Sequence, residues 1–246
     1  MIEYIRIFWY SQSVIKIPET YDKYLTSYNE YYNQLSPELK SLFLKRLYIS
    51  LKFLSFEPVE FDTITEEMKV VILSALIQIT LGLEKYVLKR FKKIIVVPNT
   101  YKFGPYEALL GHVDSKHNVI VLSWPSVQKG FIIPDDASNV ALHEMAHALQ
   151  HENHANLFFN DFFDAVLVNE WHKAGLIELY KIRKHKHTYL RKYAGQNMHE
   201  MFAVSMECFF EQPEAFQHHV PGLYHIMTKL LRQNPINIEF PTHVRF

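Results

Sequence analysis

His143-Glu144-Met145-Ala146-His147 places two imidazoles and a carboxylate within little more than one helical turn. Residues four apart lie one above the other on the same face of an α-helix, so both histidines can reach one ion. Neutral imidazole nitrogens bind Zn²⁺ at about 2.0–2.1 Å. Glu144 is one residue further round the helix, where it can take a proton from a bound water but is poorly placed to be a third ligand. The pattern is the H-E-x-x-H arrangement of zinc metallopeptidases.

Apolar residues surround this motif and predict a largely buried helix over about 137–152. Pro134, Asp135, Asp136 and Ser138, just before it, supply helix-start chemistry. A buried pair of histidine and glutamate is costly without hydrogen-bond partners or a metal ion. The alternative is a core helix with two hydrogen-bonded histidines, in a chain that has 14 of them. The surrounding apolar residues are Val140, Ala141, Leu142, Met145, Ala146, Ala148 and Leu149.

The composition indicates one domain over residues 1–246. A chain of 246 residues with 48% hydrophobic content is long enough for one substantial core. The sequence has no Gly/Ser-rich linker, low-complexity tract or internal repeat. We expect a helical N-terminal part over about 18–90, a catalytic part over about 91–235 and a C-terminal tail over 236–246.

The charge balance and the number of cysteines indicate which classes of partner and which cellular location to expect. Lys plus Arg equals Asp plus Glu, 26 each, so no overall field favours nucleic acid. The basic stretch 181–192 is interpreted as a solvent-exposed face. The single cysteine, Cys208, excludes an intrachain disulfide and indicates a reducing, cytoplasmic location. Residues 1–10 are interpreted as a docked terminus rather than a signal peptide. The longest apolar run, 70–83, is short for a membrane span and predicts a buried helix.

The order of the expected elements indicates an α-rich α+β fold. Residues 18–56 predict two or three helices, and Thr65 opens another that runs to about Arg90. Residues 94–97 and 119–122 are β-branched runs that predict strands, with a hairpin-like loop between them. Further helices follow the motif, punctuated by prolines. The small sheet thus comes just before the motif helix, and we expect 118–124 to be the strand that binds a peptide by backbone pairing.

Two downstream carboxylates compete for the third place on the metal. A catalytic zinc takes three protein ligands and leaves one position for water. Glu170 lies close to the distance at which thermolysin-like enzymes supply their glutamate. Glu200 lies farther along, and its spacing from Asn197 is also that of a helix capping box. Spacing alone leaves the two candidates nearly even.

A longer pattern favours one of them. Residues 199–210 read His-Glu-Met-Phe-Ala-Val-Ser-Met-Glu-Cys-Phe-Phe, preceded by Tyr193-Ala194. Together with the motif and Leu122-Ser123-Trp124, this stretch resembles the family of Mlc titration factor A, whose members are zinc-dependent peptidases. That family is distantly similar to the catalytic domain of anthrax lethal factor. Weaker similarity reaches back to Leu35 and forward to Pro235, so the resemblance covers most of the chain.

The resemblance implies a gluzincin-like zinc peptidase with the small sheet beside the motif helix. One Zn²⁺ per chain would be bound by His143, His147 and Glu200, with Glu144 as the general base. Tyr193 would be the active-site tyrosine that stabilises the developing oxyanion. The expected substrates are short peptides, cleaved in the manner of an aminopeptidase. The family often has Asp where this chain has Gln150, a side chain that can hydrogen-bond but has no charge.

Two further expectations concern supporting residues and an alternative function. Glu207 is either a brace for a ligand histidine or a solvent-facing residue of its helix. The alternative function is a regulatory protein that binds and sequesters a transcriptional repressor, with weak or latent peptidase activity. The name of the Mlc titration factor A family implies such a partner.

Overall fold

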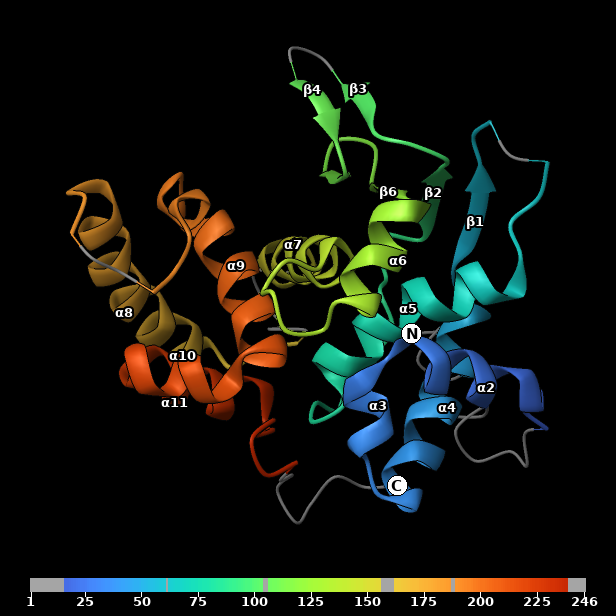
Figure 1. Ribbon diagram of the computed structural model, residues 1–246, viewed down its shortest axis with the longest axis horizontal. Helices are drawn as coiled ribbons and strands as arrows, with labels where there is room; N and C mark the ends of the chain where they lie inside the picture. Colours follow the sequence, from blue (N-terminus) through green and yellow to red (C-terminus); the bar gives the residue numbers. More distant parts are fainter. Residues whose placement is uncertain (1–15, 61, 104–105, 156–161, 187–188, 239–246) are drawn as a thin grey trace.

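A computed structural model gives the structure of the protein and describes residues 16–60, 62–103, 106–155, 162–186 and 189–238. The motif helix α7 (Val140–Ala155) lies in the middle of the molecule. Helix α9 (Met198–Glu211) packs on one side of α7, and α6 (Trp124–Ile132) with the strands lies on the other (Figure 1). The predicted features at residues 1–10 and most of the predicted tail, 239–246, lie outside the described residues.

The N-terminal helices confirm most of the prediction for residues 18–56, although residues 55 and 56 lie in a strand, β1 (Ser55–Pro58), rather than in a helix. The helices are α2 (Glu19–Tyr28), α3 (Glu30–Gln34) and α4 (Pro37–Leu51), followed by α5 (Glu66–Thr80). The side chain of Ser36 accepts a hydrogen bond from the backbone N–H of Leu39, and that of Thr65 accepts one from Met68. These bonds satisfy N–H groups that have no partner within the helix.

Helix α5 is shorter than predicted, because it ends at Thr80 rather than near Arg90. The buried guanidinium of Arg46, on α4, donates to the backbone oxygens of Thr80 and Leu81. The carbonyls at the end of a helix have no partner within it; that of Thr80 also accepts from the backbone N–H of Leu83, and the side chain of Arg46 adds a donor from elsewhere in the chain. Gly82 follows directly, packed so closely against the backbone of Arg232 that a Cβ atom would lie 2.3 Å from its oxygen.

The main sheet has four strands in the order β1-β2-β6-β5. The two predicted strands are confirmed as β2 (Lys93–Val97) and β6 (Val119–Ser123). They run parallel to each other and to β1 (Ser55–Pro58), whereas β5 (Gly111–Asp114) pairs antiparallel with β6. The predicted hairpin-like loop contains β5 and a separate antiparallel pair, β3 (Tyr101–Phe103) and β4 (Tyr106–Leu109).

This topology corrects the prediction that 118–124 is the peptide-binding strand. Strand β6 pairs with β2 on one side and with β5 on the other, so neither of its edges is free. Strand β5 is the terminal strand of the sheet, and it packs against α7. The edge beside the motif helix therefore belongs to residues 111–114.

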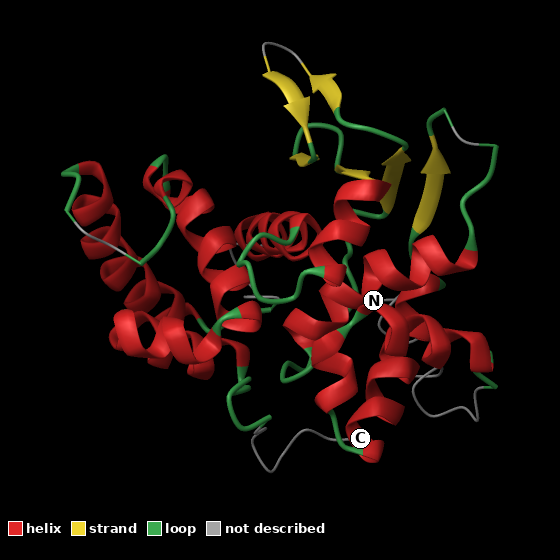
Figure 2. Cartoon of the chain, in the orientation of Figure 1, coloured by secondary structure: helices red, strands yellow, loops and turns green. Residues whose placement is uncertain are grey.

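The remaining helices confirm the α-rich part of the prediction (Figure 2). They are α8 (Ala165–Arg183), the 3₁₀ turn η1 (Lys192–Gly195), α9, α10 (Pro213–His219) and α11 (Pro221–Leu231). Pro213 and Pro221 open their helices, where a missing N–H costs nothing. Buried apolar residues from Tyr21 to Leu231 form one cluster, to which α5 contributes nine of its 15 residues. Among the described residues, no helix is long and apolar enough to cross a membrane. The fold is α+β and α-rich, with a small mixed sheet.

Candidate metal centre

Helix α7 places both motif histidines toward α9. The side chain of Asn139 accepts hydrogen bonds from the backbone N–H groups of Ala141 and Leu142, at 3.1 and 3.2 Å. Asn139 is therefore the capping residue, and the helix begins at Val140, three residues later than predicted. From this start, His143 and His147 lie one turn apart, and their ring centroids are 4.7 Å from each other.

Glu200 reaches these histidines from the first turn of α9. The side chain of Asn197 caps that helix by accepting from the N–H groups of His199 and Glu200. The helix-cap interpretation of this segment is thus correct for Asn197. The carboxylate of Glu200, however, contacts His143 and His147. Glu170, the competing candidate, is exposed on α8 and is not part of this cluster.

The three donor atoms have the spacing that a tetrahedral zinc requires. Nε2 of His143 lies 3.1 Å from Nε2 of His147 and 3.1 Å from Oε2 of Glu200. Nε2 of His147 and Oε2 of Glu200 are 3.5 Å apart. Ligand atoms bound to a tetrahedral zinc at about 2.0–2.1 Å lie about 3.3 Å from one another. These three side chains could therefore hold a metal ion, and among the described residues they form the one such group of three or more.

Electrostatics within the cluster favour a cation. Burial opposes ionisation of Glu200, but its contacts with His143 and His147 outweigh burial and hold its pKa below the usual range. Burial also opposes protonation of His143, yet hydrogen bonds to Glu200 and Glu207 raise its pKa to about 10. Without a metal, the His143 ring is therefore protonated at neutral pH and itself provides the positive charge beside Glu200. A metal that binds here displaces this proton, as metal ligands generally require.

Glu144 is buried beside the cluster with an unpaired oxygen. Its side chain is 5% exposed, and burial raises its pKa. Oε2 of Glu144 has no hydrogen-bond partner among the residues that the structure describes. A buried carboxylate oxygen without a partner is costly, and a substrate or water molecule would satisfy it. Strand β5 lies directly against this residue, since a Cβ atom on Gly111 would be 2.8 Å from Cγ of Glu144.

Tyr193 lies at the open side of the cluster, on η1. Its side chain is 44% exposed, and its ring centroid is 5.8 Å from that of His143. Burial of the hydroxyl, with the charges of Glu200 and Glu144, raises the pKa of Tyr193 to about 12. The hydroxyl therefore keeps its proton at neutral pH and can donate it in a hydrogen bond.

Glu207 contacts the far side of His143, which resolves the two alternatives considered for it. The residue is buried two turns after Glu200 on α9, and its Oε2 lies 3.0 Å from Nδ1 of His143. It also contacts Arg191, part of the basic stretch 181–192. Arg191 is the exception to the interpretation of that stretch as a solvent-exposed face, whereas Arg183 is exposed, although it donates to the backbone of Gly195 and Gln196.

Sequence reasoning missed Asn139, Gly111 and Arg191. Nothing in the local sequence distinguishes the roles of Gly111 and Arg191, because each depends on a partner far along the chain. Asn139 caps α7 through residues two and three positions on, so an asparagine just before the apolar run was the signal that could have found it. Gln150, the departure from the family pattern, is buried on α7 and lies 3.3 Å from Nδ1 of His199. Gln150 thus contacts the residue that precedes Glu200.

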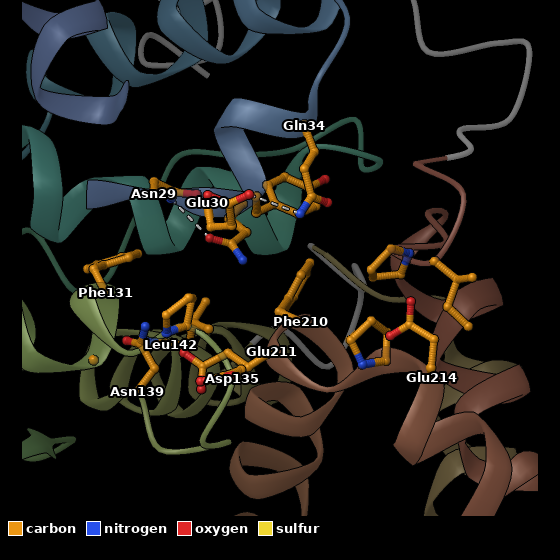
Figure 3. Close-up of a pocket in the computed structure, with 17 residues that line it drawn as sticks. Asn29, Glu30, Gln34, Phe131, Asp135, Asn139, Leu142, Phe210, Glu211 and Glu214 are labelled. Carbon is orange, nitrogen blue, oxygen red and sulfur yellow. Dashed lines mark hydrogen bonds between the residues drawn. The ribbon is translucent and has the colours of Figure 1, made fainter. Parts of the chain in front are cut away.

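A separate pocket of about 260 Å³ lies near the start of α7 (Figure 3). Asn139 and Leu142 of α7 and Phe210 and Glu211 of α9 contribute to its walls. None of His143, Glu144, His147, Tyr193 and Glu200 lines it. The pocket is therefore distinct from the group formed by His143, His147 and Glu200. Asn139 lines the pocket and also donates its backbone N–H to Glu207, which contacts His143.

Comparisons with known proteins agree with this geometry. The sequence profile of the family described as glucose-regulated metallo-peptidase M90 matches residues 9–232. The chain is 23% identical over 226 residues to an uncharacterized protein of Synechocystis sp., covering 84% of this chain and 81% of that protein. It is 27% identical over 165 residues to Mlc titration factor A of Yersinia pestis and of Yersinia pseudotuberculosis. That match spans 59% of this chain and 60% of the length of those proteins. The predicted resemblance is confirmed, and the protein belongs to the M90 family of metallopeptidases.

Proposed function

We propose that this protein is a zinc-dependent peptidase of the gluzincin type. His143, His147 and Glu200 hold one Zn²⁺, and Glu144 and Tyr193 act on the substrate. The observation that carries the proposal is the spacing of the three donor atoms, 3.1, 3.1 and 3.5 Å. Two imidazoles and one carboxylate form a donor set typical of catalytic zinc, which keeps a further position open.

Glu144 is the general base of the proposed reaction. When bound, zinc lowers the pKa of a coordinated water toward about 7 and polarises the scissile carbonyl. The free Oε2 of Glu144 accepts a proton from the attacking water and later passes it to the leaving amine. Burial supports both steps, because it raises the pKa of Glu144 and so brings it closer to the pKa of the coordinated water.

Tyr193 donates its hydroxyl hydrogen to the oxyanion that develops on the carbonyl. The position of Tyr193 next to His143 and the partial exposure of this residue support that role. The raised pKa keeps that hydrogen in place at neutral pH. One such donor contributes about 3 kcal/mol to the stability of a transition state.

The substrate is a short peptide that pairs with the edge of β5. Gly111 brings this terminal strand against Glu144, and a peptide in extended conformation can add to an open sheet edge. The aminopeptidase-like preference rests on the family resemblance. The cytoplasmic location rests on the single cysteine, Cys208, which is buried and free.

A Glu144→Gln variant tests this proposal. It should retain zinc while the hydrolysis of fluorogenic peptides falls by about 10²–10⁴-fold. Substrates with free and with blocked N-termini are compared, since an aminopeptidase requires the free amine. Glu170→Gln is the matched control, because it makes the same change at an exposed carboxylate and should alter neither property. Unchanged turnover in Glu144→Gln contradicts the assignment of the base.

A second candidate function is the capture of a transcriptional repressor. Its support is the similarity to proteins named Mlc titration factor A. Binding of a purified repressor is measured by titration calorimetry with and without a chelator, in parallel with peptidase activity. Repressor binding that survives the chelator, in a chain without peptidase activity, favours this function over hydrolysis.

A further inference from the structure

Glu207 is the centre of a buried polar network behind the metal cluster. Its side chain is 2% exposed. Three donors reach its carboxylate: Nδ1 of His143 at 3.0 Å, the backbone N–H of Asn139 at 2.9 Å, and Nη2 of Arg191. Full hydrogen bonding offsets much of the cost of burying the charge, and it also fixes where each oxygen lies.

The contact with Nδ1 determines which nitrogen of His143 faces the metal. Oε2 of Glu207 is an acceptor, so it requires a hydrogen on Nδ1. In the neutral imidazole, the lone pair is then on Nε2, the atom that faces His147 and Glu200. A carboxylate in this position also makes the imidazole a stronger ligand.

Arg191 ties Glu207 to two other segments. Its Nη2 donates to Oε2 of Glu207, and its Nη1 donates to the backbone oxygen of Ala137 at 2.9 Å. Ala137 precedes the capping residue of α7, and Glu207 accepts directly from that capping residue, Asn139. The rigid fork of a guanidinium can make both bonds at once, which a lysine ammonium matches poorly.

We propose that Glu207 and Arg191 form a brace for the metal site. Glu207 is a positioning residue that acts through His143, and Arg191 is a positioning residue that acts through Glu207. Helix α9 thus supplies the ligand Glu200 and, two turns later, the group that orients a ligand on α7. The proposal rests on the metal site of the proposed function but not on peptide hydrolysis.

Zinc affinity, measured by competition with a chromophoric chelator, tests the first half of the brace. Glu207→Gln should bind zinc about 10–100-fold more weakly. Glu211→Gln is the matched control, because Glu211 is one turn further on α9 and accepts from the N–H of Ser138 but does not contact His143. The control should bind zinc as the wild type does. Thermal unfolding of the zinc-free proteins shows whether each variant is folded. If Glu207→Gln is not folded, Glu207→Asp takes its place. A folded Glu207 variant with wild-type affinity, or equal losses in both Gln variants, overturns the proposal.

A double-mutant cycle tests the second half. Arg191→Lys retains the positive charge but loses the fork, so zinc affinity should fall by about three- to tenfold. In the Glu207→Gln background, the same change should have less than about a twofold effect. Equal losses in both backgrounds overturn the role of Arg191. If zinc affinity depends on Glu207 and Arg191 in this way but the protein cleaves no peptide, the proposed function is contradicted and the proposed brace is still supported. A wild-type chain that binds no zinc contradicts both.

Discussion

Replacing Gly111 with alanine should impair turnover while leaving the metal in place. The added Cβ atom would lie 2.8 Å from Cγ of Glu144 and 2.9 Å from Cγ2 of Val140. Both distances are shorter than ordinary van der Waals contact by about half an ångström. Strand β5 is held by its pairing with β6, and Val140 begins α7. The side chain of Glu144 is therefore the group that gives way.

The expected loss follows from the size of that displacement. A misplacement of 1 Å can cost about 100-fold in rate, so a shift of half that size should lower kcat about tenfold. Overpacking should also reduce the free energy of unfolding by about 1–3 kcal/mol. Zinc affinity should stay within about twofold of the wild type, because the atoms nearest to the added Cβ belong to Glu144 and Val140 rather than to the three proposed ligands.

The assay is steady-state peptide hydrolysis at saturating zinc, with chelator competition for the affinity. Gly222→Ala is the control, since a Cβ atom there meets nothing within 4 Å. Wild-type kcat in a folded Gly111→Ala variant would refute the placement of Glu144 against β5. Loss of zinc in that variant would refute the separation of the base from the ligands.

Three other changes have defined outcomes. Tyr193→Phe should retain zinc but lower kcat by about 10²-fold, because one oxyanion donor is lost; an unchanged kcat excludes that role. Asn139→Ala should reduce the free energy of unfolding in urea by about 1 kcal/mol, since it removes the cap of α7, and an unaltered midpoint contradicts the cap. Burial and the charges of Glu207 and Asp136 raise the pKa of Glu211 to about 8 from an ordinary value of 4.5. The wild type therefore loses stability relative to Glu211→Gln as the pH rises through this window. A pKa raised from 4.5 to about 8 corresponds to about 5 kcal/mol, so the difference should approach that value at pH 9 and vanish below pH 4, and a difference independent of pH contradicts it.

The parts of the site that depend on local spacing could be predicted from the sequence. His143 and His147 share a face because of the helical period alone, so two of the proposed ligands and the proposed base follow from five residues. Caps such as Ser36 and Thr65 act within three residues, and the helices they start were predicted correctly. The third proposed ligand, Glu200, is 57 residues from His143, and only the family pattern distinguished it from Glu170.

Three features were predicted wrongly or missed, because distant contacts or a weak local pattern leave no signal in the sequence. The apolar pattern continues past Thr80, but α5 ends there, where Arg46, 34 residues earlier, binds the carbonyl of Thr80 and Gly82 packs against the backbone of Arg232. Strand β1 was missed because its four residues are mostly exposed and lack apolar alternation. Arg191 lies in a stretch rich in lysine and arginine, where its contacts with the distant Glu207 and Ala137 leave no mark on the local sequence.

The zinc content of purified protein tests the central claim most directly. The wild type should have about one zinc per chain by elemental analysis, Glu200→Ala should lose it, and Glu170→Ala should retain it. A wild type without zinc, or loss of zinc in Glu170→Ala but not in Glu200→Ala, would contradict the proposed metal site.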